Sequence, residues 1–472
     1  MSLQTNLLEQ SLTRRATLAA GAGAAASLAL GALPAWARVR TSGDGRHGTR
    51  PDELPNPDRA MGEPAIPEIE TLVLVMLENH SADNLLGMLP SLAPRRRRYF
   101  DGLPVSRRGV PVAGNPDGHG GRVRSFHAPD MCPSSGLTQN WNSSHRQYDH
   151  GRNDGFVTNA QSRTPMSYFL PRDVPIINSL AARFPVGDRY FSSMLGQTLP
   201  NRRYWFSGTS SGQVNDDDSS FLVRAANGTI FDRLDAAHIR WHLYYSRNSF
   251  PTPFYFPNFR DNPLQVARCV AQQQFFSDAA AGRLPPVSYV EANGSYQSEE
   301  NPQDLAYGEN FLHEVAQACM HSPQWGKLAL VVNYDEHGGY YDHVVPPAAV
   351  PPDDIPPDLH LSAKGTYPAK FNRYGFRVPF VVASRWGRPN YVSHRVMDHT
   401  SVLGFIEHKW NLPPMTRRDA GAWDMHDMFD FSRPRMHAID LPAPPSISKT
   451  TAVCKAHGEN PPSPQPTPVP SP

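Results

Sequence analysis

Cysteine is scarce in this 472-residue chain. The four cysteines are Cys132, Cys269, Cys319 and Cys454, and none of them form a C-x-x-C pair. This argues against a zinc ribbon or a scaffold held by many disulfides, while one or two disulfides remain open for an exported protein. An excess of either charge is also lacking. The formal net charge is +1, so no overall field draws the chain to nucleic acid or to an anionic membrane, and no nucleic-acid partner is expected.

Long hydrophobic runs are lacking after the first 37 residues. No later stretch approaches the roughly 20 apolar residues of a transmembrane helix, so stable membrane insertion is not expected. Proline, in contrast, is abundant at 48 residues, which disfavours an all-helical fold and predicts many irregular connections. The hydrophobic fraction of 39% and the aromatic fraction of 10% are sufficient for a packed core.

The N-terminus has the pattern of an export signal. Arg14-Arg15 precede an uncharged run rich in Ala, Gly and Leu, and Ala35-Trp36-Ala37 offers a small-x-small cleavage site. The paired arginines resemble a twin-arginine signal, which implies the twin-arginine translocase as a partner. An ordinary Sec signal or an uncleaved anchor is the alternative. We expect a mature protein that begins near Arg38 and is periplasmic or secreted.

The rest of the chain divides by composition. Residues 38–66 are polar and rich in Gly and Pro, which is typical of a linker. Residues 67–445 form the expected catalytic domain. Residues 446–472 are assigned to a C-terminal tail, because the end of the chain alternates Pro with small polar residues and cannot bury a core.

Short continuous apolar runs alternate with amphipathic segments in the central part of the chain. The runs at 69–77, 328–334 and 378–383 predict buried strands, since strands covered on both faces are apolar throughout. The segments 174–184, 305–319 and 399–410 predict helices. This alternation predicts an α/β fold with a doubly wound, mostly parallel sheet, helices on both faces and irregular Pro-rich insertions. In such sheets ligands bind beyond the carboxyl ends of the strands.

Polar side chains follow the first two predicted strands. Glu78 and Asn79 come directly after the first strand, and Asp335 and Glu336 come directly after the second. A carboxylate at the end of a buried strand requires a positive partner, either a metal ion or a basic side chain. The pattern therefore predicts a functional site where these two strands end, with helix capping and turn formation as the alternative for each segment alone.

Four segments of the sequence are similar to the bacterial phosphoesterases that include phospholipase C enzymes and secreted acid phosphatases. They are Leu77–Asp83, Gly196–Arg202, Tyr334–Gly339 together with Asp342-His343, and Asp398–Ser401. The resemblance spans residues 69 to about 420 and implies an alkaline-phosphatase-like fold with the site at the strand ends.

The resemblance assigns roles to individual residues. It implies that Glu78, Asn79, Asp335 and Glu336 hold one divalent metal ion, and that Thr198 is the nucleophile that forms a phosphothreonine intermediate. Oxygen ligands suit calcium, magnesium or manganese, and they can also hold zinc. A bound cation would stabilise the threonine alkoxide. Without the resemblance, a turn residue before Pro200 is the favoured interpretation of Thr198.

Several other side chains are candidates for contact with the substrate. His343 and His337 could protonate the leaving group or donate to a phosphoryl oxygen, and Arg202 could bind the phosphate. Gln139 and Asn301 stand where the family usually has histidines, so they could face the substrate without a titratable proton. Aromatic residues concentrate at 241–259, where they either line an apolar lipid pocket or pack in the core.

The sequence therefore predicts an exported, metal-dependent hydrolase of phosphate esters, with a small phosphate ester or a phospholipid as substrate. The alternative is an exported protein that binds phosphate ligands with weak or no turnover. The replaced histidines favour the alternative, whereas the complete set of acids and the hydroxyl nucleophile favour the hydrolase.

Overall fold

The computed structural model describes residues 50–93, 99–132, 137–217, 221–247, 249–359 and 366–459. The predicted signal peptide at 1–37 lies outside these residues. Within them, no helix combines the length and the apolar character that crossing a membrane requires.

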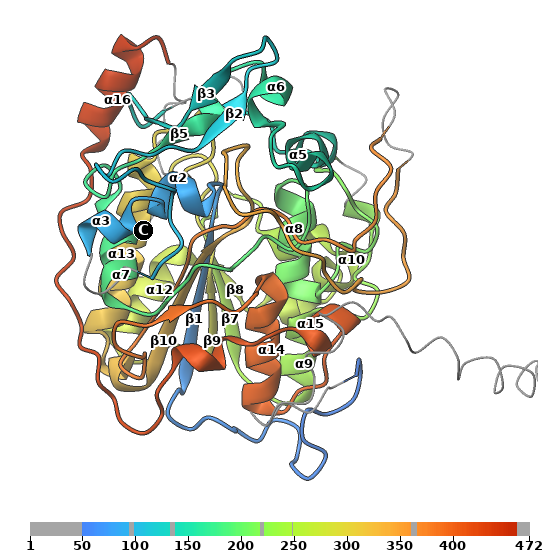
Figure 1. The fold of residues 1–472 in the computed structure, drawn as a ribbon. Coiled ribbons are helices and arrows are strands. Elements are labelled where there is room, and N and C mark those ends of the chain that lie inside the picture. The colour runs from blue at the N-terminus through green and yellow to red at the C-terminus, as the bar shows by residue number, and fades with distance from the viewer. Residues whose placement is uncertain are drawn as a thin grey trace, which may run out of the picture. The chain divides into compact units, whose positions relative to one another are not determined.

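An eight-stranded sheet forms the centre of the fold, in the order β12-β6-β11-β10-β1-β9-β7-β8 (Figure 1). The strands are β1 (Thr71–Leu77), β6 (Val186–Gly187), β7 (Trp241–Tyr245), β8 (Cys269–Ala271), β9 (Val287–Val290), β10 (Leu328–Tyr334), β11 (Phe380–Ser384) and β12 (Val392–Ser393). Every residue of β1 and β10 is buried, as expected for strands covered on both faces. The predicted α/β fold with a mostly parallel sheet is confirmed.

One central strand runs against the others. β1 pairs in parallel with β9 and β10, whereas β11 pairs antiparallel with both β10 and β6. The third predicted strand is therefore present, but it runs in the opposite direction. Its carboxyl end lies at the other end of the strands from the carboxyl ends of β1 and β10. A continuous apolar run indicates burial on both faces and carries no information about strand direction.

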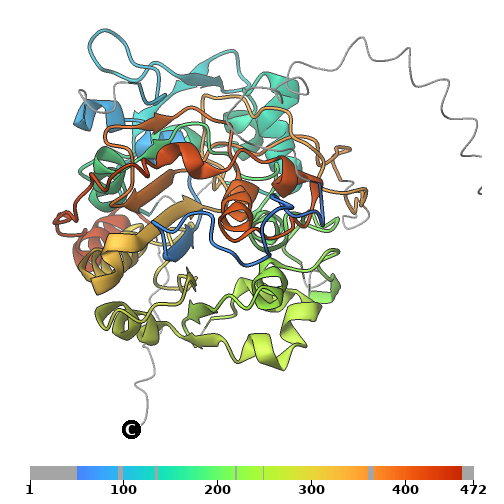
Figure 2. The ribbon, with the colours of Figure 1, turned by 90° about the horizontal axis from the view of Figure 1, so that it is seen from below.

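Helices cover both faces of the sheet, as Figures 1 and 2 show. One layer contains α7 (Pro175–Arg183), α12 (Gln272–Ala280) and α13 (Ala306–His321). The other layer contains α8 (Thr198–Ser207), α9 (Ile230–Ala236) and α14 (His399–Trp410). The predicted helices at 174–184, 305–319 and 399–410 correspond to α7, α13 and α14.

The connections carry short additional elements. Between β1 and α7 lie α2 (Ala82–Leu86), α3 (Leu89–Leu92), α5 (Trp141–Tyr148), α6 (Phe156–Ala160) and the strands β2 (Gly114–Pro116), β3 (Arg122–Arg124), β4 (Phe126–His127) and β5 (Ser167–Tyr168). Near α8 lie α10 (Pro257–Arg260) and α11 (Pro263–Val266), and α15 (Arg417–Gly421) follows α14. The elements β2, β3, β5, α5 and α6 of the insertion between β1 and α7 lie above the carboxyl ends of β1 and β10 (Figure 1).

The predicted boundaries of the catalytic domain differ from the structure at both ends. Residues 447–456, assigned to an extended tail, form helix α16 (Ile447–Ala456), which a disulfide between Cys132 and Cys454 attaches to the domain. Part of the predicted linker also contacts the domain, because the backbone N–H of Ala65 donates to the carbonyl of Lys409 on α14. Both differences arise from contacts with residues distant in the sequence, which composition cannot indicate.

Candidate active site

The ends of β1 and β10 bring two acidic side chains together. The strands pair in register, with Thr71 opposite Leu328 and Leu77 opposite Tyr334. The next residues along the chain are Glu78 and Asp335, and the backbone N–H of Asp335 still donates to the carbonyl of Leu77 at 3.1 Å. Parallel pairing in register therefore places both acids at the same edge of the sheet, as the sequence predicted.

Arg202 of α8 is the basic partner of these two acids. Its Nη2 lies 2.8 Å from Glu78 Oε1 and its Nε lies 2.9 Å from Asp335 Oδ2. All three side chains are largely buried, so the pairing meets the requirement that a charge at the end of a buried strand be compensated. Arg202, predicted to bind substrate, is thus bound to the two acids in this structure.

Thr198 occupies the first position of the same helix, one turn before Arg202. Residues four apart lie on one face of a helix, so α8 directs Thr198 and Arg202 to the same side. The helix N-terminus carries a partial positive charge that favours an anion, and in this structure the N–H of Leu199 donates to Asp216 Oδ1 at 2.8 Å. A hydroxyl nucleophile at this position is well placed to meet a phosphate group.

Asn79 and Glu336 complete the predicted set of oxygen ligands. Asn79 Nδ2 donates to Glu336 Oε1 at 2.8 Å, and the backbone N–H of Gly338 donates to Glu336 Oε2 at 2.7 Å. Gly338 has a φ of +64°, and a Cβ at this position would approach the carbonyl oxygen of Asn79 to 2.0 Å. The glycine after Glu336 therefore permits a close contact between the β1 and β10 loops that no other residue would allow.

Burial raises the pKa values of the two acids that follow β10. Burial raises the pKa of Asp335 to about 7, even though Arg202 opposes this effect, and burial together with Asp335 raises the pKa of Glu336 well above its usual range. A buried carboxylate resists ionisation unless a cation compensates it. The carboxylates at the ends of β1 and β10 therefore favour a bound positive charge beyond the single guanidinium of Arg202.

Two further acids lie close to this site and were not predicted from the sequence. Glu300 interacts with Glu78 and Asp335, and burial raises its pKa to about 8. Glu291 follows β9, is buried near Arg202, and accepts from the backbone N–H of Thr252 at 3.1 Å. The position of Glu291 after a strand was a usable signal, but β9 is only four residues long and its sequence contains Ser288 and Tyr289.

The predicted ligands fit a metal ion chemically. All offer hard oxygen atoms, and the buried Asn79 Oδ1 has no hydrogen-bond partner within the described residues. Within the described residues, two groups of three side chains have potential ligand atoms that all lie within 4.8 Å of one another. Both groups lie away from this site. One comprises Asp304 and the disulfide-bonded Cys132 and Cys454, so it offers no thiolate. The other is Asp83, Asp342 and His343.

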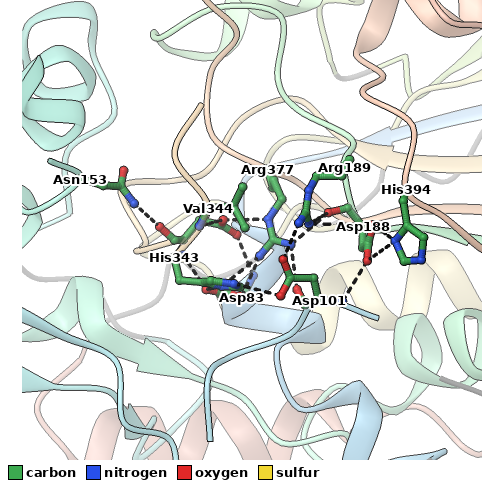
Figure 3. A network of polar contacts seen from close by, with 10 residues as sticks. Asp83, Asp101, Asn153, Asp188, Arg189, His343, Val344, Arg377 and His394 are labelled. Carbon is green, nitrogen blue, oxygen red and sulfur yellow. Dashed lines mark hydrogen bonds and ion pairs between the residues drawn. The ribbon is translucent and has the colours of Figure 1, made fainter. Parts of the chain in front are cut away.

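His343 belongs to a separate polar network, shown in Figure 3. Its Nδ1 lies 2.8 Å from Asp83 Oδ2, its Nε2 lies 3.2 Å from Asp101 Oδ1, and Arg377 pairs with both Asp83 and Asp342. Burial alone would lower the pKa of His343, but the two carboxylates outweigh burial and raise it to about 10. Both ring nitrogens of His343 are engaged by carboxylates in this structure, and its role as a proton donor stays a prediction.

His337 and His399 are buried and hold the surrounding loops. His337 Nε2 pairs with Gln147 Oε1 at 2.7 Å, and burial lowers its pKa to about 3. His399, the first residue of α14, has its Nε2 2.8 Å from the carbonyl oxygen of Asp335. A ring that stays neutral at physiological pH can position a neighbouring group, and His399 is placed to do so for Asp335. The geometry does not support His337 as a proton donor to a leaving group.

Gln139 and Asn301, which are predicted to stand in place of family histidines, belong to segments beside the loop after β10. Asn301 Oδ1 accepts from the hydroxyl of Tyr340 at 2.9 Å. Thr138, the neighbour of Gln139, packs so closely on Gly339 that an added Cβ would come within 2.7 Å of its backbone nitrogen. The structure thus brings both replacements to the segment that carries Glu336.

Comparison with known proteins identifies relatives over most of the chain. Residues 69–413 match the sequence model described as the Phosphoesterase family. The chain is 31% identical to non-specific phospholipase C1 of Arabidopsis thaliana, over 76% of this chain and 71% of that protein. It is 29% identical to phospholipase C B of Mycobacterium tuberculosis, over 78% of each chain. It is 28% identical to the non-hemolytic phospholipase C of Pseudomonas aeruginosa, over 82% of this chain and 60% of that protein.

Among solved structures, the chain is similar to a protein in the alkaline phosphatase superfamily from Vibrio parahaemolyticus. The TM-score is 0.38 at 9% sequence identity, and the match covers 82% of this chain and 76% of that chain. The assignment of the fold class rests on the sheet and its two helix layers described above.

Proposed function

We propose, since this chain belongs to the Phosphoesterase family and is a phosphoric ester hydrolase, that Thr198 is its nucleophile and that it cleaves phospholipids in the manner of a phospholipase C. The observation that carries the proposal is the arrangement of α8. This helix presents Thr198 one turn from Arg202, whose guanidinium contacts Glu78 and Asp335. A hydroxyl nucleophile, a cationic group and paired acids are the parts that phosphoryl transfer requires.

The proposed reaction has two steps. Thr198 Oγ1 loses its proton and attacks phosphorus, the bond from phosphorus to the diacylglycerol oxygen breaks, and that oxygen takes up a proton. The phosphothreonine intermediate still carries the headgroup. Water then attacks phosphorus, the bond to Thr198 Oγ1 breaks, and the phosphorylated headgroup leaves, so the hydroxyl is regenerated. The N-terminus of α8 binds the phosphoryl oxygens and stabilises their negative charge, and the guanidinium of Arg202, held by Glu78 and Asp335, adds positive charge one turn away.

A divalent cation is part of the proposal. Glu78, Asn79, Asp335 and Glu336 would hold it, and when bound it would favour the ionised form of the Thr198 hydroxyl. The unpaired Asn79 Oδ1 and the raised pKa of Asp335 support a cation at this position. The chemistry of the ligands leaves calcium, magnesium, manganese and zinc as candidates.

The substrate class follows from two considerations. The curated relatives are named phospholipases C, and their substrates contain a phosphodiester with one negative charge. Gln139 and Asn301 replace histidines that would add positive charge, which disfavours a dianionic phosphomonoester more than a monoanionic diester. We therefore infer a preference for phosphodiesters.

Export through the twin-arginine route is also proposed. The disulfide between Cys132 and Cys454 is consistent with an oxidising compartment such as the periplasm or the extracellular space. Changing Arg14-Arg15 to Lys-Lys should retain the protein in the cytoplasm, as detected by cell fractionation. Normal export of that variant would contradict the assignment of the route.

The experiment that tests the function compares two soluble chromogenic substrates, a phosphomonoester and a phosphocholine diester. The proposal predicts hydrolysis of the diester, its loss on removal of divalent cations, and its recovery when one of the candidate metals is added. Binding of phosphate without hydrolysis of either ester would instead support the phosphate-binding alternative.

A further inference from the structure

A group of apolar side chains reaches the surface beside the proposed site. We name it the rim cluster; its members are Phe221, Leu222, Phe250, Phe254 and Tyr255. Leu222 is 80% exposed and Phe250 is 49% exposed. The aromatic members contact one another, with ring centroids 4.3 Å apart for Phe221 and Tyr255 and 5.1 Å apart for Phe250 and Tyr255. These residues therefore form a contiguous surface feature and are not scattered single residues.

The structure separates two roles within the aromatic segment 241–259. Phe256 and Phe259 are fully buried in the main core. Phe250 and the half-buried Phe254 and Tyr255 lie outside or at the edge of that core. Both interpretations of this segment from the sequence thus apply, each to different residues. Burial in the core explains the first set but leaves the exposure of Phe250 and Leu222 unexplained.

Two consecutive residues of helix α8, Arg202 and Arg203, contact the segments that carry the rim cluster. Arg202 Nη1 lies 3.5 Å from Thr252 Oγ1, two residues after Phe250. Arg203 Nη2 donates to the carbonyl of Val223, next to Leu222, at 2.8 Å. Arg203 also lies over the ring of Phe256 at 4.3 Å. The same turn of α8 that follows Thr198 therefore supports both segments of the rim cluster.

Three arginines lie next to the segments of the rim cluster, and two of them pair with Asp261. Arg247 and Arg224 are exposed, and Arg224 Nη2 lies 3.9 Å from Asp261 Oδ2. Arg260 donates to the carbonyls of Phe221 and Phe254. Apolar and aromatic side chains bordered by arginines match the two layers of a phospholipid surface, which are acyl chains and phosphate headgroups.

We propose that the rim cluster is the surface by which this enzyme docks on a phospholipid bilayer. The inference rests on the proposed phospholipase function and deepens it, because it assigns the surface that presents the substrate to Thr198. A phospholipid phosphate lies at the boundary between headgroups and acyl chains. Insertion of Leu222 and Phe250 at that boundary would hold the N-terminus of α8 near the phosphate without drawing the acyl chains into water.

Vesicle binding tests the docking surface directly. The probes are vesicles of phosphatidylcholine alone and of phosphatidylcholine mixed with phosphatidylglycerol, and the protein carries Thr198→Ala so that the lipid stays intact. Adding Leu222→Ser and Phe250→Ser should weaken binding to both kinds of vesicle by about tenfold for each side chain, because each loses the transfer of an apolar group out of water. A matched control is Val453→Ser on α16, a residue that is 45% exposed and far from α10 in Figure 1. This control should bind like the parent protein.

Kinetics separate docking from chemistry. With Thr198 intact, Leu222→Ser/Phe250→Ser should lose activity on vesicles by a factor similar to the loss in binding. It should keep the kcat/KM of the wild type on a soluble phosphocholine diester. If Leu222→Ser/Phe250→Ser binds vesicles as the parent protein does, the docking surface is overturned. The same holds if the protein binds only vesicles that contain phosphatidylglycerol and this binding does not depend on Leu222 and Phe250. No hydrolysis of the soluble ester by the wild type would instead overturn the proposed function.

Discussion

Arg202 and Asp335 are joined by a hydrogen bond of 2.9 Å between Nε and a carboxylate oxygen, and Arg202 reaches Glu78 at the same time. The guanidinium therefore compensates the acids that are proposed to bind a cation. Because these groups are buried, removing one partner leaves an uncompensated charge at a cost of about 3–5 kcal/mol.

Arg202→Gln should consequently make folding dependent on metal. Without divalent cations, the variant should unfold at a clearly lower temperature than the wild type. Added metal should raise the Tm of the variant more than it raises the Tm of the wild type. In the variant no guanidinium competes with the metal for Glu78 and Asp335. Thermal unfolding with and without each candidate metal measures this difference, and Arg202→Lys serves as the charge-retaining control. Equal metal-induced shifts in Tm for the wild type and Arg202→Gln would contradict the compensation.

Thr198→Ala should lower kcat on a phosphodiester by at least about 1000-fold, because the nucleophile and its activating groups act as one unit. The Tm should be nearly unchanged, since Thr198 lies at the first position of α8 and is only partly buried. Thr198→Ser retains a hydroxyl and should keep measurable turnover. A turnover of Thr198→Ala close to that of Thr198→Ser would remove this residue from the mechanism.

Gln139→His combined with Asn301→His should shift specificity toward phosphomonoesters. Two added imidazolium groups would stabilise a dianion more than a monoanion. The ratio of kcat/KM for a matched monoester and diester should rise, and a new ionisation between about pH 5 and 8 should appear in the pH profile. If the ratio and the profile both stay as in the wild type, neither residue faces the phosphate.

The network around His343 predicts a loss of stability at alkaline pH. The pKa of His343 is raised from 6.5 to about 10 in the folded protein, so the folded state binds its proton more tightly than the unfolded state. The stabilisation is complete below pH 6.5 and is lost as pH rises toward 10. His343→Asn should therefore flatten the decline of the unfolding free energy between pH 6.5 and 10, as measured by urea denaturation.

His337 provides the opposite control. Burial lowers its pKa from 6.5 to about 3, so its stabilisation is present above pH 6.5 and is lost as pH falls toward 3. His337→Gln should leave the alkaline decline intact. If His337→Gln and His343→Asn flatten the same limb of the profile, the assignment of the network is wrong.

Sequence patterns were informative where burial is continuous. The apolar runs of β1 and β10 located the edge of the sheet that carries Glu78 and Asp335. The apolar stripe at 399–410 matched α14. Each of these features is encoded within a few adjacent residues, so local patterns were sufficient to predict them.

Features that depend on distant contacts were not predicted. The disulfide between Cys132 and Cys454 joins residues 322 positions apart and keeps α16 with the domain. The antiparallel direction of β11 depends on how the chain returns to the sheet. The pairing of His343 with Asp83 and Asp101 required the loops after β1 and β10 to meet. Residue type alone could not indicate these carboxylate partners.

The most direct test of the proposed mechanism is to trap the covalent intermediate. Wild-type protein is mixed with excess soluble phosphodiester, quenched in acid, digested and analysed by mass spectrometry. With a soluble phosphocholine diester as the substrate, the mechanism predicts one phosphocholine group on the peptide that contains Thr198, the same group on the serine of Thr198→Ser, and no label in Thr198→Ala. Hydrolysis that proceeds at the normal rate in Thr198→Ala, or a phosphoryl group on a different residue, would contradict it.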